Sequence, residues 1–141
     1  MFPRKADPPQ FRLREAVRAL ALYGSNIFTR GNTPKQYKIS YGVKIIELSA
    51  ELFSCVNLSL DKLNRPLYKS NPTDREIQSH KTRCRDEARL WARRAEEVYI
   101  KLKSHWELLL GEPSMANRRE PVYRLEADVG SNLGGWLKSL G

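Results

Sequence analysis

Apolar residues recur at steps of three and four positions in four long stretches of the chain, and this spacing predicts amphipathic α-helices. Proline and glycine residues separate the stretches. The expected helices cover about residues 11–28, 33–64, 73–110 and 117–140. No segment shows the alternation of polar and apolar residues that a half-buried strand requires. The sequence therefore predicts an all-α fold.

Two of the expected helices begin with a capping sequence. In each, a threonine and a glutamine or glutamate three residues later are placed to satisfy free amides of the first turn: Thr33 with Gln36, and Thr73 with Glu76. Short connections between consecutive helices favour antiparallel neighbours. We therefore expect an antiparallel up-down-up-down four-helix bundle.

The apolar stripes also predict the core. The second helix has the widest apolar face, because Ile46 and Phe53 adjoin its main stripe. The expected core positions on the other helices include Leu13, Ala16, Val17, Leu20 and Ile27 on the first, Cys84, Ala88, Trp91, Ala95, Val98, Leu102 and Leu109 on the third, and Val122, Leu125, Val129, Leu133, Trp136 and Leu137 on the fourth.

The length of 141 residues suits one domain, which we expect over residues 11–141, after a disordered basic tail at residues 1–10. Lysine and arginine number 25 against 16 acidic residues, which gives a net charge of +9. A charge of this sign attracts polyanions, nucleic acid first and anionic membranes or acidic proteins second. The sequence shows neither a membrane span nor a signal peptide, so we expect a soluble cytoplasmic protein with no membrane partner.

Basic residues gather in three places that are candidate sites for RNA or for a protein partner. Four of them recur at every fourth position of the third helix, and others lie on its opposite flank and toward its end. The first helix carries three arginines, and two lysines flank Tyr37 at the start of the second. The candidate residues are Arg12, Arg14, Arg18, Lys35, Lys38, Lys81, Arg85, Arg89, Arg93, Arg94, Lys101 and Lys103.

These basic patterns also fit ordinary structural roles. The cations of the third helix are equally consistent with a solvated face whose charges pair with nearby carboxylates. Tyr37 and Tyr41 either stack bases or lie half-buried at a helix end, and such a pattern favours the second. The first forty residues hold too few acidic groups to neutralise their cations, which favours a polyanion site.

The sequence contains no catalytic or metal-binding pattern. His80 and His105 lie far apart on the third helix without a carboxylate at ligand spacing. There is no GxSxG turn, phosphate loop or dinucleotide fingerprint. Cys55 and Cys84 fall in apolar runs and are predicted to be small core residues. We expect a protein that is not an enzyme and that needs no metal or cofactor.

Three glycines interrupt the strong helical pattern near the C-terminus. Gly130, Gly134 and Gly135 each cost about 1 kcal/mol of helix stability relative to alanine. We expect compensation from the close approach of another helix, within the bundle or from a second subunit, with Trp136 packed beside the gap.

Two short runs resemble one known family. The run LEADVGSNLGGWLKSL resembles the end of the accessory variability determinant (Avd) proteins of diversity-generating retroelements, and its matching residues are Asp128, Val129, Gly130, Leu133, Gly134, Gly135, Trp136 and Leu137. The run PKQYKISYG, at residues 34–42, is similar to the start of the second helix in that family. Residues 64–85 depart from the family pattern, because they are polar and longer than expected.

This resemblance implies both an assembly and a function. Avd proteins are four-helix bundles that form homopentameric barrels, bind the retroelement reverse transcriptase and its template-repeat RNA, and support mutagenic cDNA synthesis. For this chain it implies a noncatalytic accessory subunit, bacterial or phage-encoded, whose partners are the polymerase, that RNA or its RNA/cDNA hybrid, and copies of itself. Lys101 and Lys103 fall roughly opposite cations of the family.

The alternative is a related four-helix bundle of the type encoded in ribosomal-RNA intervening sequences. Such a protein would act as a protein-interaction scaffold with no specific nucleic-acid role.

Overall fold

The computed structural model describes residues 8–31 and 33–141, and these residues are largely helical. The four long helices are α1 (Pro9–Thr29), α3 (Val43–Leu63), α4 (Asp74–Leu110) and α5 (Arg119–Ser139). Three short pieces lie between them: α2 (Lys35–Tyr37), the π-helical η1 (Lys38–Gly42) and the 3₁₀ helix η2 (Pro113–Arg118). No strand occurs in the described residues, so the prediction of an all-α fold with four long helices is confirmed for them.

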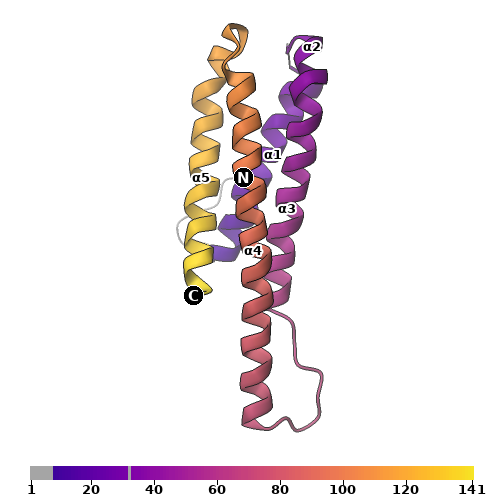
Figure 1. The fold of residues 1–141 in the computed structure, drawn as a ribbon, viewed down its shortest axis with the longest axis vertical. Helices are drawn as coiled ribbons and strands as arrows, with labels where there is room; N and C mark the ends of the chain where they lie inside the picture. Colours follow the sequence, from indigo (N-terminus) through magenta and orange to yellow (C-terminus); the bar gives the residue numbers. More distant parts are fainter. Residues whose placement is uncertain (1–7, 32) are drawn as a thin grey trace.

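The long helices lie side by side in a bundle (Figure 1). The connections from α1 to α3 and from α4 to α5 are at one end, and the connection from α3 to α4 is at the other. At the first end Gly24 of α1 packs against both Trp106 of α4 and Ile45 of α3. At the other end Asn64, just after α3, donates to the side-chain oxygen of Gln10 on α1 at 3.2 Å. None of the helices described is long and apolar enough to span a bilayer.

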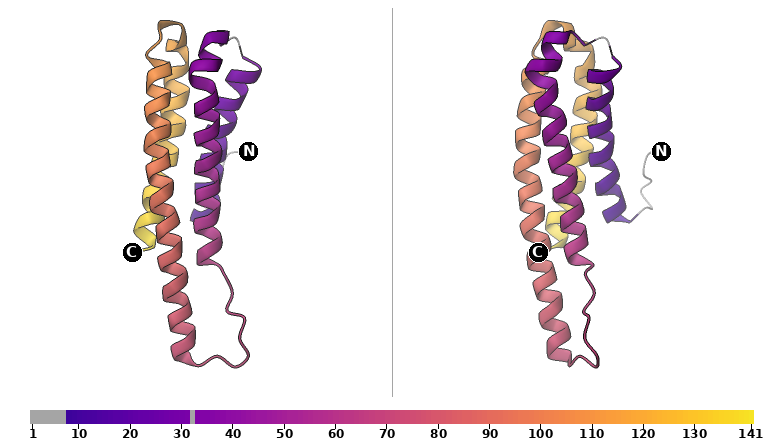
Figure 2. Two further views of the ribbon diagram at one scale, coloured as in Figure 1. Left: turned by 45° about the vertical axis from the view of Figure 1, so that its right-hand side comes forward. Right: turned by 90° about the vertical axis from the view of Figure 1, so that its right-hand side faces the viewer.

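Helix α4 is longer than the bundle in which it packs. Its 37 residues correspond to about 55 Å at 1.5 Å per residue. Figure 2 shows that the start of α4, together with the loop that precedes it, extends beyond the ends of α1 and α5. The loop before α4 and the first turns of α4 fall within residues 64–85, the stretch that departs from the pattern of the Avd proteins.

The core follows the predicted stripes, except that Ile46 is exposed and that Trp91, Leu125 and Leu137 are only partly buried. Leu20, Leu52 and Leu102 are fully buried. Ile46, expected on the core face of the second helix, is 38% exposed, because only the side of α3 that faces α4 and α1 is covered. Phe53 is partly buried against the core.

Helix α1 begins two residues earlier than predicted. Pro9 lies in the first turn of the helix. The backbone amides of that turn have no partner within the helix, so the missing N–H of proline costs no hydrogen bond there. Gln10 follows it within the helix. Of the predicted tail, residues 1–7 lie outside the described residues, and Pro8 directly precedes α1.

The cap predicted at Thr33 is wrong. The Thr33 hydroxyl instead donates to the carbonyl of Ile27 at 2.7 Å, and the threonine is buried against the end of α1. Helix α2 begins after Pro34 without a side-chain cap. The following π-turn ends at Gly42, where an added Cβ would lie 2.9 Å from a ring carbon of Phe28. Close packing of this ring on the backbone therefore requires glycine.

The capping box at Thr73 is confirmed. Its hydroxyl accepts from the Glu76 amide at 3.1 Å, and the Glu76 carboxylate accepts from the Thr73 amide at 3.2 Å. The last helix starts at Arg119, later than predicted, because residues 113–118 form η2. Pro121 lies in the first turn of α5, where it is tolerated.

Candidate nucleic-acid interface

Helix α4 carries most of the predicted site residues and spreads them along its length. Lys81 and Lys103, the first and last of these, are about 33 Å apart along the helix axis. The arginines of α1 lie on a different helix, and Lys35 and Lys38 lie on α2 and η1, at the end of the bundle where α4 ends. The structure therefore distributes the predicted cations over several surfaces and does not form one patch from them.

Arg89 is occupied by contacts within the chain. Its Nη2 donates to the carbonyl oxygen of Leu140 at 2.7 Å, and its Nη1 lies 3.6 Å from a carboxylate oxygen of Asp86. Leu140 caps the C-terminus of α5, where a cation satisfies a free carbonyl and complements the helix dipole. Arg89 thus fastens α5 to α4 and is a poor candidate for phosphate.

The other members of the predicted ridge on α4 are free to meet a ligand. Lys81, Arg85 and Arg93 are exposed. None of the three has an ion-pair partner among the described residues. Lys81 and Arg85 precede Arg89 on α4, the residue that contacts the C-terminal end of α5. These three cations can therefore approach phosphates without breaking an internal ion pair.

Arg94 and Lys101 form the opposite flank of α4, and both are exposed. Arg94 lies close to Cys55 of α3 and affects the pKa of its thiol. Burial and the charge of Glu51 raise this pKa, and the positive charge of Arg94 lowers it. Lys101 is seven residues further along the same side of the helix, about 10 Å away. This flank thus presents two cations with regular spacing to solvent.

Lys103 is half-buried, unlike the cations of that flank. Its Nζ lies 4.7 Å from the centre of the Tyr99 ring, a cation–π contact. Part of its role is therefore to cover this tyrosine.

The arginines of α1 differ in their freedom. Arg14 is exposed, whereas Arg18 lies 3.4 Å from Glu15 in a solvent-exposed ion pair that constrains it weakly. Arg12 is half-buried, and its buried Nε has no hydrogen-bond partner among the described residues. Arg14 and Arg18 are thus the two members of this group that remain accessible to a ligand.

The two tyrosines of the second helix are tied down by a carboxylate. The hydroxyls of Tyr37 and Tyr41 donate to the two oxygens of Glu112, at 3.1 and 3.3 Å, and their ring centres are 5.9 Å apart. Burial and then Glu112 raise the pKa of Tyr41, which keeps its hydroxyl protonated as a donor. The half-buried interpretation is therefore confirmed. Lys35 is exposed and Lys38 half-buried beside them.

The role of Glu112 has no signal in the local sequence. This residue is far from both tyrosines in the chain, and it lies just after α4 in the turn toward η2. No local pattern links it to them. Its negative charge makes this end of the bundle less favourable for phosphate, despite the two neighbouring lysines.

The close approach expected for the C-terminal glycines within the bundle is found at Gly130 only. An added Cβ at Gly130 would lie 3.2 Å from the hydroxyl of Tyr99. Gly134 and Gly135 are exposed, and apart from the adjacent residues and the backbone of their own helix, no atom of the described chain lies within 4 Å of the position that their Cβ would take. Packing inside this chain therefore does not explain the last two glycines.

Trp136 packs away from those exposed glycines and into the core. It is 6% exposed, and its Nε1 donates to the Ser59 hydroxyl on α3 at 2.9 Å. Ser59 in turn donates to the carbonyl oxygen of Ala88 on α4 at 2.6 Å. A short hydrogen-bond chain thus joins α5, α3 and α4.

A buried carboxyl group lies between α4 and α5. Glu126 is 7% exposed, and its Oε2 has no hydrogen-bond partner among the described residues. Burial raises the pKa of Glu126 to about 7, although Lys103 lowers it, and Glu107 adds to the rise. The Tyr99 hydroxyl donates to the backbone carbonyl of the same residue, and burial raises the pKa of Tyr99 to about 12.

The cysteines are buried in the bundle, and the histidines contact backbone carbonyls. Cys55 and Cys84 are buried and unbridged. The His80 ring contacts the carbonyl of Arg65 at 2.8 Å, and the His105 ring contacts that of Lys101 at 2.8 Å. Within residues 8–31 and 33–141, no group of three His, Cys, Asp or Glu side chains is arranged to hold a metal ion.

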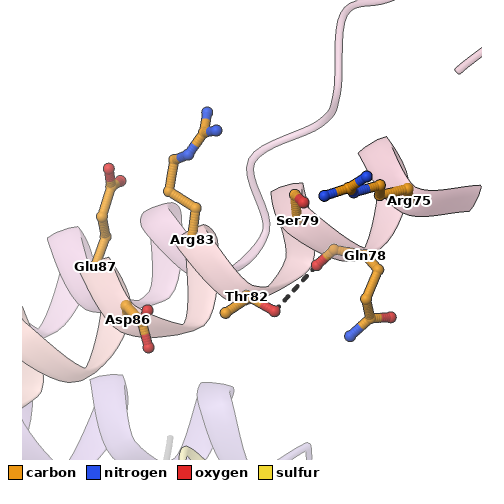
Figure 3. Close-up of a pocket in the computed structure, with 7 residues that line it drawn as sticks. All are labelled: Arg75, Gln78, Ser79, Thr82, Arg83, Asp86 and Glu87. Carbon is orange, nitrogen blue, oxygen red and sulfur yellow. Dashed lines mark hydrogen bonds between the residues drawn. The ribbon is translucent and has the colours of Figure 1, made fainter. Parts of the chain in front are cut away.

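The projecting part of α4 carries a shallow surface hollow of about 550 Å³ (Figure 3). Arg83 and Glu87 extend from the same side of the helix there, and the Thr82 hydroxyl donates to the carbonyl of Gln78 at 3.0 Å. Two arginines and two carboxylates line this hollow. Because these charges balance, it offers no net attraction to a polyanion.

Comparisons of the chain with protein-family models, with curated proteins and with solved structures found no match.

We expect Gly134→Ala to raise the free energy of unfolding by about 0.5–1 kcal/mol, because alanine favours the helix and nothing opposes its methyl group. Urea denaturation followed by circular dichroism measures the change. Gly130→Ala is the matched control and should gain less, since its methyl group would press on Tyr99. A destabilised Gly134→Ala protein, or one of lower mass by light scattering, would contradict an exposed site and indicate that another subunit packs there.

Proposed function

We propose that the protein is a noncatalytic accessory subunit of a diversity-generating retroelement. It binds the reverse transcriptase and its template RNA, or the RNA/cDNA hybrid, and supports mutagenic cDNA synthesis. In this proposal the chain is encoded by a bacterium or a phage and acts in the cytoplasm. It forms an antiparallel up-down-up-down bundle that assembles with copies of itself into a homopentamer.

The observation that carries this proposal is the set of exposed cations on α4. Arg93, Arg94 and Lys101 are accessible and have no ion-pair partner among the described residues, on a chain whose net charge is +9. Such cations release counterions when they bind phosphates, which is the main source of affinity in sequence-independent RNA binding. The C-terminal Leu-Gly-Gly-Trp run gives the proposal its retroelement context.

The assembly is supported by apolar side chains that the single chain leaves without an internal partner. Ile39 and Val43, which are 68% and 56% exposed, extend an apolar stripe along η1 and α3. Contacts between copies would bury this stripe.

The experiment that tests RNA binding compares salt dependence in a charge-reversal variant. The full chain is titrated against a labelled single-stranded RNA over a range of salt concentrations. We expect the double variant Arg93→Glu/Arg94→Glu to bind at least about tenfold more weakly. Its log–log salt slope should be smaller by about 0.7 for each lost phosphate contact.

The matched control is Arg124→Glu/Lys138→Glu on α5, which changes the charge of the chain equally at two exposed positions. A specific role for α4 requires that the α4 variant lose more affinity for RNA than this control does. Affinity that is independent of salt, or equal in the two variants, would contradict the proposal. A nuclease-resistant mass near five subunits would support the assembly.

A protein-interaction scaffold of the ribosomal-RNA intervening-sequence type is the second candidate. It is favoured by exposed apolar side chains on α4, where Leu90 and Leu108 are 68% and 62% exposed. A scaffold of this type would bind a protein partner at high salt and after nuclease treatment, and the α4 charge reversal would leave that binding unchanged.

A further inference from the structure

A hollow of about 400 Å³ lies on the exposed side of α4, near the middle of the helix. Its apolar floor consists of Leu90, which is 68% exposed, and Trp91, which is half-buried and rests against the core. The sequence stripe placed Trp91 in the core, but part of its indole lines this hollow. The hollow therefore makes part of an aromatic ring on α4 accessible.

The charges around this aromatic surface favour an anion. Arg93 and Arg94 line the hollow, are exposed and have no ion-pair partner in the described part of the chain. Glu97 is the one carboxylate in the lining, so the lining carries a net positive charge. The hollow near the start of α4, by contrast, has a neutral lining.

We infer that this hollow binds an unpaired nucleotide of single-stranded RNA, with the base stacked on Trp91 and adjacent phosphates held by Arg93 and Arg94. The inference rests on the proposed function and specifies the form of RNA that the α4 surface recognises. Aromatic side chains stack on any base, because every base has a π-face, and the cations hold the backbone. Lys101, two helical turns beyond Arg94, extends the path for the next phosphates.

The geometry favours an unpaired strand over a duplex. Bases inside a duplex stack on one another and present only their edges in the grooves, so they cannot cover an indole. Tyr37 and Tyr41 are bonded to Glu112, whose negative charge repels phosphate. Tyr68 and Tyr123 are 89% and 49% exposed, but the cations that follow them in the chain, Lys69 and Arg124, pair with Glu76 and Glu120. Trp91, by contrast, lines a hollow together with two exposed arginines that have no ion-pair partner among the described residues.

Tryptophan fluorescence of the full chain reports directly on this contact. Trp106 and Trp136 are 0% and 6% exposed, so a ligand on the surface of α4 reaches Trp91 and not the other two. The probe is an oligouridylate of about ten nucleotides, compared with the same strand annealed to its complement. We expect the single strand to quench the emission and the duplex to leave it unchanged.

Variants then separate stacking from charge. Trp91→Leu is expected to weaken binding of the oligouridylate about tenfold, because leucine keeps the apolar volume and loses the π-face. Trp91→Phe should retain most of the affinity, since phenylalanine still stacks. It also preserves the packing against the core, should leucine disturb it. Glu97→Gln should bind more tightly, because it removes the one negative charge of the lining.

Three results would overturn the inference. In the first, RNA binding is sensitive to salt but does not quench the tryptophan emission, and Trp91→Leu binds with the same affinity as the unmodified chain. This result would leave the proposed function intact. Emission that changes on dilution and not with RNA would assign the hollow to a contact between copies. Failure of the unmodified chain to bind any RNA at low salt would remove the proposed function itself, together with this site.

Discussion

Replacing Trp136 by alanine is expected to lower the free energy of unfolding by about 3–5 kcal/mol. The indole is 6% exposed, and its removal leaves a large cavity between α5 and its neighbours. It also removes the hydrogen bond to Ser59, one step of the chain that joins three helices. Since small domains are stable by about 5–15 kcal/mol, this one substitution removes a large part of the total. Urea denaturation followed by circular dichroism measures the loss.

Two further variants divide this loss into packing and hydrogen bonding. Trp136→Phe keeps most of the volume and loses the indole donor, so it should cost less than alanine does. Ser59→Ala removes the acceptor, and the double variant gives the coupling between the two, which we expect to be about 1 kcal/mol. A loss below about 1 kcal/mol for Trp136→Ala would show that the C-terminal part of α5 contributes little to the bundle.

The parts of the fold that depend on local periodicity could be predicted from the sequence. The stripe of α4 identified Ala88 and Leu102 as core residues, and both are fully buried. The capping box of Thr73 and Glu76 was also predictable, because all of its atoms lie within one helical turn. Such features need no knowledge of how the helices pack.

Features that depend on contacts between helices could not be predicted in this way. Thr33 has the sequence of a cap, yet a distant carbonyl at the end of α1 takes its hydroxyl. Gly42 is required because the ring of Phe28 packs on it, and the π-turn beside it leaves no signature in the spacing of apolar residues. Tertiary packing overrides local preference at both places.

The same limit applies to the candidate interface. Sequence spacing placed Arg89 and Arg93 on one ridge of α4. It could not show that the C-terminus of α5 contacts Arg89 and leaves Arg93 exposed. It assigned Trp91 to the core by periodicity, whereas Leu90 next to it is exposed and the indole is only partly covered. Which cations and aromatics remain available to a ligand depends on where neighbouring helices end.

The contribution of Glu126 to the stability of the protein is expected to fall as the pH rises from about 4.5 to about 7. Burial raises the pKa of Glu126 from 4.5 to about 7 in the folded chain. Below about pH 4.5 this group is protonated in both states, and its contribution to stability is fully present. Between the two pKa values the unfolded chain has lost this proton and the folded chain still holds it, so folding becomes less favourable with rising pH.

At 1.36 kcal/mol per unit of pKa difference, this effect amounts to at most about 3 kcal/mol by pH 7, and it stays constant above that value. Glu126→Gln removes the charge and keeps the shape, so its stability should vary less over this range and exceed that of the unmodified chain at pH 8. Urea denaturation at a series of pH values measures both curves. Glu120→Gln, at an exposed position of α5, is the matched control and should follow the unmodified chain. Equal pH dependence in the Glu126→Gln and Glu120→Gln proteins would mean that the Glu126 carboxyl group is solvated in the folded state, because only a group whose pKa differs between the two states couples stability to pH.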